Sequence, residues 1–92
     1  MEITVHFTAQ LKRSLGMATD KVLLPLGGTT ADLWLALANR FGAPFTDVAL
    51  EVDGRLASSM LLCINQVQVP RGAERALRDG DEVHVISAIS GG

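Results

Sequence analysis

"GGTTADLWLALANRFGAP", residues 27–44, is the stretch that decides the fold, because it contains the clearest helix of the sequence. Thr29 followed three residues later by Asp32 has the form of a capping box, the reciprocal hydrogen bonding that begins many helices. Gly42 suits the position just past a helix, and Pro44 is expected to stop the helix from continuing. The apolar residues recur at helical spacing on one side: Leu33, Trp34, Leu37, Ala38 and Phe41. A helix with one apolar face predicts one sheet for it to cover.

Two strands are predicted before this helix. Residues 2–8 alternate strictly, with Ile3, Val5 and Phe7 on one face, which is typical of a half-buried strand. Gly16 predicts a turn, and residues 21–26 predict a second strand, with Pro25 at its end or on a sheet edge. We therefore expect the two N-terminal strands to form a hairpin.

Three strands are predicted after the helix. Residues 45–59 give a weak signal, compatible with a short helix or an irregular connection, with a turn at Asp53-Gly54. Further strands are predicted over residues 60–64, 67–69 and 82–86, separated by turns at Asn65-Gln66 and Asp79-Gly80. The run at 60–64 is apolar throughout, as in the middle of a sheet, and Val83 and Val85 should face inward.

The order of these elements predicts an α+β fold. We expect one domain over residues 1–92, with a mixed sheet of about five strands packed on one main helix, a β-grasp roll. A right-handed crossover through the helix would place the strand at 60–64 parallel to the first strand. Residues 87–92, "SAISGG", should then project from the sheet as a tail.

The bulk composition excludes several classes of protein. With 48% hydrophobic and 20% charged residues, the 92-residue chain should fold. A formal net charge of −2 argues against binding to nucleic acid, and no apolar run approaches the roughly 20 residues that span a membrane. The N-terminus has no signal-peptide layout, and a lone cysteine, Cys63, allows no internal disulfide and fits a reducing compartment. We expect a cytoplasmic protein that is a monomer when free.

The candidate catalytic residues inside the domain are few. His6 and His84 lie at outward strand positions, and neither has a carboxylate or nucleophile as a neighbour in the sequence. We interpret both as surface histidines. Cys63 falls within an apolar strand, where a buried thiol behaves as a small hydrophobic group. We expect no catalytic site within the domain.

Two further patterns suggest a ligand only weakly. Asp79, Asp81 and Glu82 surround a glycine turn, but they lack the ligand number and spacing of a calcium loop, so a solvated turn is the better interpretation. Gly27-Gly28 precedes a helix, as in phosphate-binding loops, but the lysine of such loops is missing. We expect the chain itself to bind no cofactor and no metal.

The tail ends on Gly91-Gly92, which contribute nothing to a core. A segment without side chains can pass through a narrow channel and present its carboxylate to the active site of another enzyme. Glycine tolerates whatever extended path the channel requires. The position of the pair, just beyond the last strand of a β-grasp pattern, therefore suggests a function for the tail.

These features together resemble the MoaD/ThiS family of ubiquitin-like sulfur carriers. The resemblance rests on the order of elements, on "LRDGDEV" (residues 77–83) and on Gly91-Gly92, with "DGRL" (residues 53–56) also similar to members of the family. The family includes the small subunit of molybdopterin synthase and the carrier of thiazole synthesis. Many relatives have Asn-Gly where this chain has Asn65-Gln66, and molybdopterin-synthase subunits tend to carry prolines where this chain has "SAIS".

The resemblance implies a role for the C-terminal carboxylate. A partner resembling the ubiquitin-activating enzymes would adenylate Gly92 with ATP and Mg²⁺, Gly91 would help the tail to thread, and a persulfide would convert the adenylate to a thiocarboxylate. A sulfur-accepting synthase, with the large subunit of molybdopterin synthase as the leading choice, would then use this sulfur in heteromeric complexes. The alternatives are a carrier for thiazole or another metabolite, a protein modifier joined to lysines, and a plain interaction module.

A docking surface is expected beside the tail. Ile86 has the opposite parity from the inward-facing valines of its strand, and it could form an apolar patch with Ile89 next to Ser90. The predicted rim of this patch consists of Asp79, Asp81 and Glu82. The alternative is that Ile86 covers a sheet edge of its own domain.

Overall fold

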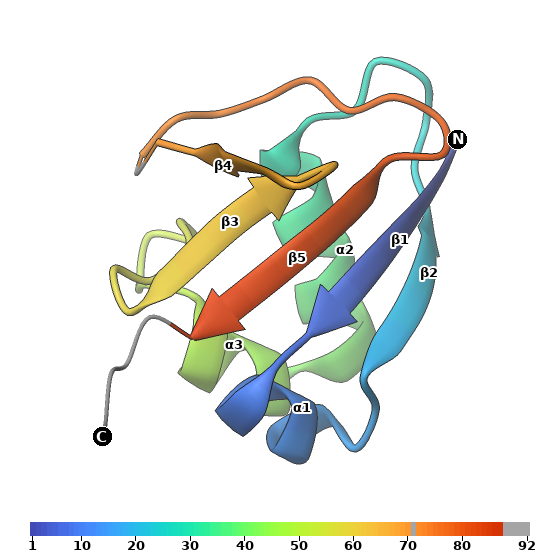
Figure 1. Cartoon of the computed structure of the whole chain (residues 1–92). Helices are drawn as coiled ribbons and strands as arrows, with labels where there is room; N and C mark the ends of the chain where they lie inside the picture. The colour runs from blue at the N-terminus through green and yellow to red at the C-terminus, as the bar shows by residue number, and fades with distance from the viewer. Residues whose placement is uncertain (71, 88–92) are drawn as a thin grey trace.

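A five-stranded mixed sheet organises the chain (Figure 1). The computed structural model describes residues 1–70 and 72–87. Its elements are β1 (Glu2–Phe7), α1 (Ala9–Leu15), β2 (Thr19–Leu23), α2 (Thr30–Phe41), α3 (Ala43–Ala49), β3 (Met60–Ile64), β4 (Val67–Val69) and β5 (Glu82–Ser87). The strands lie in the order β2-β1-β5-β3-β4. This mixed sheet packed on α2 confirms the predicted β-grasp fold.

The central pair of strands differs from the prediction. β1 pairs in parallel with β5, whereas β3 runs antiparallel to β5 and therefore antiparallel to β1. The prediction that residues 60–64 run parallel to the first strand is therefore wrong. After α2 and α3 the chain does not form a strand beside β1. It forms β3 two positions from β1 in the sheet, which leaves the position between them free for β5. β5 then fills the central place, so the strand parallel to β1 is the last of the chain.

Helix α2 forms as its sequence predicts. The Thr29 amide donates to Asp32 Oδ2 at 2.8 Å, and both halves of the capping box are present. The residues of its apolar face that are buried are Leu33, Trp34 and Leu37, and Ala38 and Phe41 are partly buried against the same core. α2 ends at Phe41, before Pro44 as predicted, but a second helix, α3, begins at Ala43. Pro44 lies in the first turn of α3, where a missing amide costs no helical bond, and Gly42 redirects the chain between the two helices.

Helix α1 is absent from the predicted order. It occupies the connection between β1 and β2, which pair antiparallel as expected. Gly16, predicted as a turn, caps this helix with a φ of 75°. Among its seven residues only Leu11 is buried. The apolar pattern of this segment is therefore too short to predict a helix from the sequence. Pro25 lies just past the end of the edge strand β2, as expected.

The connections in the second half of the chain contain more regular structure than the sequence suggests. The weak segment 45–59 contains most of α3 and a small bridge between Leu50 and Leu56 around the turn at residues 53–54. The hairpin between β3 and β4 turns through Asn65 and Gln66, both with positive φ, 50° and 71°. Such values match a two-residue hairpin turn whose preferred sequence is Asn-Gly.

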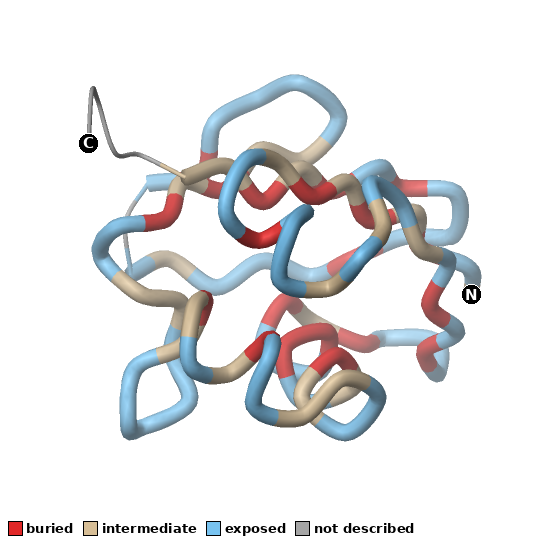
Figure 2. The backbone as a smooth tube through the Cα atoms, turned by 90° about the horizontal axis from the view of Figure 1, so that it is seen from below, coloured by how far each residue is buried: buried red, intermediate tan, exposed pale blue. Residues whose placement is uncertain are grey.

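The core lies between the sheet and the helices. Inward positions alternate along β1 and β5, where Ile3, Val5, Val83 and Val85 are fully buried. Figure 2 marks the buried positions along the strands and helices, with the exposed connections around them. Within the described ranges, no helix is both long enough and apolar enough to cross a membrane. Within residues 1–70 and 72–87, no helix covers the opposite face of the sheet, which is called the open face below (Figure 1).

Candidate functional site at the end of the central strand

The end of β5 is fastened on both sides. Thr8, just after β1, accepts a hydrogen bond from the Ser87 amide at 3.4 Å and donates to the Val85 carbonyl at 3.4 Å. On the other side, Ser87 pairs with Met60 of β3. The predicted tail began at residue 87, but Ser87 is the last residue of β5. Ser87, the last described residue, therefore lies at a strand end that two neighbouring segments hold in place (Figure 1).

Ile86 lies on the open face of the sheet, as its parity predicts. Val83 and Val85 face the core, and Ile86 pairs in register with Leu61 of β3 on the outer face, where both side chains are partly buried. The alternative interpretation, that Ile86 covers a sheet edge, is wrong because β5 is the central strand. Leu61 was not predicted, although its parity between the buried Met60 and Leu62 could have identified it.

A cavity adjoins this pair. It measures about 720 Å³ and opens among the start of α2, the connection over residues 51–58, and β3 and β4. Met60 and Leu61, the pairing partners of Ser87 and Ile86, lie in its wall. No residue of β5 lines this cavity, which lies one strand away and touches the β5 partners Met60 and Leu61. The other predicted tail residues, Ile89, Ser90, Gly91 and Gly92, lie outside the described residues.

The acidic residues predicted as the rim of the Ile86 patch lie elsewhere. They gather where β5 begins, and a six-residue strand at about 3.3 Å per residue separates them from its end. Asp79 Oδ1 accepts a hydrogen bond from the Glu2 amide at 2.7 Å. Asp81 is only 9% exposed, and its carboxylate accepts from Asn65 Nδ2 and from the Arg78 amide, each at 2.8 Å. The carboxylates of both aspartates therefore fix turns and do not border Ile86.

Glu82, the third of these acids, contacts a histidine. His6 Nε2 lies 2.8 Å from Glu82 Oε1, and the His6 ring stacks on that of His84 at 4.3 Å between centroids. His6 has no carboxylate neighbour along the sequence, and Glu82 reaches it only through the parallel pairing of β1 with β5. Cys63 of β3 pairs with His84 of β5. Its side chain is half-buried, whereas the sequence predicted a buried thiol. These side chains form a polar strip across the open face.

The polar strip does not form a metal centre. Among residues 1–70 and 72–87, no group of three or more histidine, cysteine or acidic side chains is arranged to hold an ion. The Glu82 carboxylate and the His6 ring hold each other at the surface, where such pairs contribute about 0–1 kcal/mol to stability. The site therefore consists of the fastened end of β5, the Ile86–Leu61 pair and the adjoining cavity.

Comparison with known proteins identifies the family. A model of the ThiS family matches residues 5–92. The chain belongs to the ThiS family. No curated protein sequence matches this ThiS-family chain. The crystal structure of SAMP1 from Haloferax volcanii, a small archaeal modifier protein, is similar over 100% of both chains, with 25% identity and a TM-score of 0.83.

Two further solved structures share the fold. A candidate molybdopterin converting factor, subunit 1, from Pyrococcus furiosus has 20% identity and a TM-score of 0.71, covering 97% of this chain and 99% of its own. CysO in the Amycolatopsis orientalis BexX/CysO complex has 22% identity and a TM-score of 0.71, covering 98% and 99%. These two structures show the shared fold, and the family match together with the likeness to SAMP1 places the ThiS-family chain among the ubiquitin-like sulfur carriers and modifiers.

Proposed function

We propose that this ThiS-family chain is a sulfur carrier whose Gly92 carboxylate becomes a thiocarboxylate. The main support is the family match, which extends through residue 92. The fastened end of β5 adds to it, because neighbouring segments hold Ser87, the last described residue before the tail, at one fixed point of the sheet. Gly91 and Gly92 lack side chains, so the channel of a partner enzyme can accept them in an extended path.

The chemistry requires activation by a partner. A carboxylate is a poor electrophile, so an adenylyltransferase resembling the ubiquitin-activating enzymes uses ATP and Mg²⁺ to form an acyl-adenylate at Gly92, releasing pyrophosphate. The sulfur of a persulfide then attacks the acyl carbon and displaces AMP. A thiol reduces the resulting acyl disulfide, leaving the thiocarboxylate on Gly92 and a new disulfide on the partner. The chain contributes the covalent handle and the docking surface.

The surface beside the end of β5 serves the docking in this proposal. Ile86 and Leu61 supply an apolar contact on the open face of the sheet, and the cavity beside Met60 accepts a projecting side chain of the partner. Ile89 and Ser90 follow in the sequence and extend this contact toward the active site of the partner. An apolar patch next to a reactive end positions that end without taking part in the chemistry.

The favoured pathway for the sulfur is molybdopterin synthesis. The support is the sequence "GRLASSMLLCINQ", residues 54–66, which resembles the longer molybdopterin-type members of the family. In this proposal the thiocarboxylate inserts into the large subunit of molybdopterin synthase and donates its sulfur to the pterin precursor. Thiazole synthesis is the alternative pathway for the same sulfur chemistry.

Intact mass spectrometry tests the carrier function. The full chain is incubated with the adenylyltransferase that copurifies with it, ATP, Mg²⁺ and a persulfide donor. We expect a mass increase equal to replacement of one oxygen by sulfur, and no increase in a variant that lacks Gly92. An unchanged mass, under conditions in which the enzyme releases pyrophosphate with this chain, would disprove thiocarboxylate formation. Sulfur transfer to the pterin precursor, with the copurifying large subunit, then tests the pathway.

Protein modification is the second candidate function. Its support is the similarity to SAMP1 over the whole of both chains. The same acyl-adenylate would then be attacked by a lysine amine of another protein, forming an isopeptide bond and releasing AMP. Tryptic digests of cells that express the tagged chain should contain lysines linked to the C-terminal residues of this chain. Their absence from cells in which the thiocarboxylate is detected would leave sulfur transfer as the function.

A further inference from the structure

Helix α1 carries an exposed positive charge, the basic patch formed by Lys12 and Arg13. Both side chains are exposed, and neither forms an ion pair with any acidic side chain that the structure describes. α1 itself contains no acidic residue. The other cations of the described ranges lie beside acids, in ion pairs at Lys21, Arg40 and Arg55, and next to Glu74 and Asp79 along the chain at Arg75 and Arg78. The patch is therefore a local positive charge on a chain of net charge −2.

The position of α1 brings this patch beside the end of β5. Thr8, which accepts the Ser87 amide, is also the cap residue at the start of α1. The Lys12 amide donates to the Thr8 carbonyl at 3.3 Å, so Lys12 lies one helical turn, about 5.4 Å, from Thr8 and on the same side of the helix. The other side faces α3, where Ser14 donates to the Pro44 carbonyl at 2.7 Å. Figure 1 accordingly shows α1 at the end of the sheet toward which β1 and β5 run.

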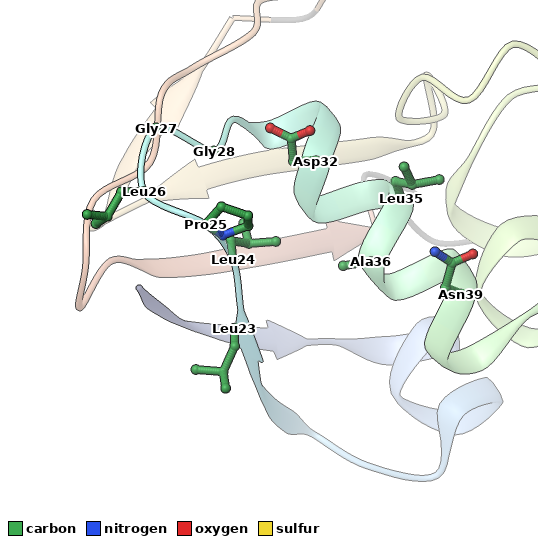
Figure 3. Close-up of a pocket in the computed structure, with 10 residues that line it drawn as sticks. All are labelled: Leu23, Leu24, Pro25, Leu26, Gly27, Gly28, Asp32, Leu35, Ala36 and Asn39. Atoms are coloured by element: carbon green, nitrogen blue, oxygen red, sulfur yellow. The ribbon is translucent and has the colours of Figure 1, made fainter.

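Other surface features of the molecule lack such unpaired charge. A groove of about 430 Å³ beside the end of β2 is nearly uncharged (Figure 3). Among its lining residues only Asp32 is charged, and this carboxylate already accepts the Thr29 amide in the capping box of α2. The aspartates at the start of β5 likewise accept backbone amides. The basic patch differs from both, so a partner of opposite charge can pair with it without breaking a contact of the domain.

We propose that the basic patch contacts acidic side chains of the adenylyltransferase, at the rim of the channel that receives the tail. This inference rests on the proposed function, because it takes the activating enzyme as the partner. That enzyme is common to both candidate functions, since sulfur transfer and protein modification each begin with an acyl-adenylate. Charges at the rim of an interface steer the approach of the partner and fix its orientation.

The basic patch and the apolar pair contact the enzyme on two sides of the strand end. The Ile86–Leu61 pair lies on the open face of β5 and β3, whereas α1 follows β1, the neighbour of β5 on its other side. Two contacts that flank Ser87 fix the direction of the strand end relative to the channel. A single apolar patch leaves rotation about that patch free, so the basic patch adds orientation to the docking.

The chain contains its own control. Its two lysines are Lys12 and Lys21, and both are exposed. Lys21 lies in the edge strand β2 and pairs with Thr4, which in turn pairs with Glu82 at the start of β5. The two lysines therefore lie toward opposite ends of β5. If the enzyme contacts only the end, identical substitutions at these two positions should have different effects.

Association rates test the proposal. Binding of the full chain to the adenylyltransferase that copurifies with it is followed by stopped-flow fluorescence. In about 0.01 M salt we expect Lys12→Glu to slow association roughly fivefold or more, and Lys21→Glu to associate as the original chain does. In about 1 M salt the difference should disappear, because the screening length falls from about 30 Å to about 3 Å. Lys12→Gln and Arg13→Gln should each slow association to a smaller extent, and they keep the test valid if an added acid disrupts the last turn of α1.

Carbodiimide cross-linking locates the contact. The reagent joins a lysine amine to a carboxylate in direct contact through an amide bond, and the carbodiimide takes up the water that is released. Mass spectrometry of the digested complex should find Lys12 joined to an acidic residue of the enzyme, and no such link at Lys21. Equal association rates of Lys12→Glu and Lys21→Glu, or no link at Lys12, would overturn the basic patch as a contact. The mass change at Gly92 reports the proposed function separately, and absence of any association of the original chain would overturn both proposals.

Discussion

At the scale of single residues, Asp81 joins the turn before β5 to the hairpin between β3 and β4. Its carboxylate accepts hydrogen bonds from Asn65 Nδ2 and the Arg78 amide and is largely buried. Asp81→Ala should lower the free energy of unfolding by about 1.5–3 kcal/mol, because two partly buried hydrogen bonds to a charged acceptor are lost. Urea denaturation measures the loss. The control Asp47→Ala, at an exposed position of α3, should stay within about 0.5 kcal/mol.

Ile86 allows the docking surface to be tested without disturbing the core. Ile86→Asp should weaken binding of the adenylyltransferase or the synthase subunit by about tenfold or more, because it places a charge opposite Leu61 in the apolar contact. The thermal unfolding transition should remain cooperative, since the side chain lies on the open face. Calorimetric titration measures the affinity, with Leu26→Asp, at an exposed position just beyond the edge strand β2, as the control. Equal affinity of Ile86→Asp and the original chain would exclude Ile86 from the docking surface.

The sequence predicted which face of the sheet a side chain lies on better than it predicted which side chains it contacts. Parity along one strand placed Val83 and Val85 inside and Ile86 outside, and all three predictions are confirmed. The contact between His6 and Glu82 was not predicted, because 76 residues separate them and only the strand order joins them. Asp81 was predicted to lie in a solvated turn for the same reason: its contact with Asn65 depends on how distant strands pair and is not visible along the sequence.

At the scale of elements, the hairpin between β3 and β4 contains an unfavourable residue. Gln66 has a φ of 71°, a left-handed conformation that costs residues other than glycine about 1–2 kcal/mol. Gln66→Gly should therefore raise the free energy of unfolding by about 0.5–1 kcal/mol, after allowing for the greater entropy of glycine in the unfolded chain. Gln68→Gly, the same change inside β4, should lower it by about 0.5–1 kcal/mol. Changes of the same sign in the two variants would contradict this interpretation of the turn.

Elements with a repeating apolar pattern were predictable, and those without one were not. The capping box and apolar face of α2 identified that helix, and the apolar run at 60–64 gave the bounds of β3. Helix α1 buries one leucine and has no comparable signal. The place beside β1 is taken by β5, the last strand of the chain, and not by β3. The crossover rule was applied to β1 and β3 as consecutive elements, so it predicted the wrong strand as the parallel partner of β1.

At the scale of the whole molecule, β5 is required for folding, and the residues after it are expected to serve partners. Deletion of residues 88–92 should shift the melting temperature by under about 4 °C, which for a domain of this size is under about 1 kcal/mol. Deletion of residues 82–92 also removes Val83 and Val85 from the core and should abolish the cooperative transition. Circular dichroism melts compare the two. A large loss of stability from the shorter deletion would assign the tail a structural role.

The pairing of β1 with β5 also determines the order in which the molecule can fold. Contacts made by these strands and their flanking residues join positions 77 to 79 residues apart, whereas β1 and β2 are close in sequence. Closing so long a loop costs roughly 4 kcal/mol of chain entropy before the central ladder stabilises anything. We therefore expect the β1–β2 and β3–β4 hairpins to form early and β5 to insert between them last, with slow folding for a chain of this length. The strand that precedes the proposed reactive end is thus the one whose arrival completes the native state. If an activating enzyme docks on β5 and β3 as proposed, it would bind fully folded molecules and reject incompletely folded ones.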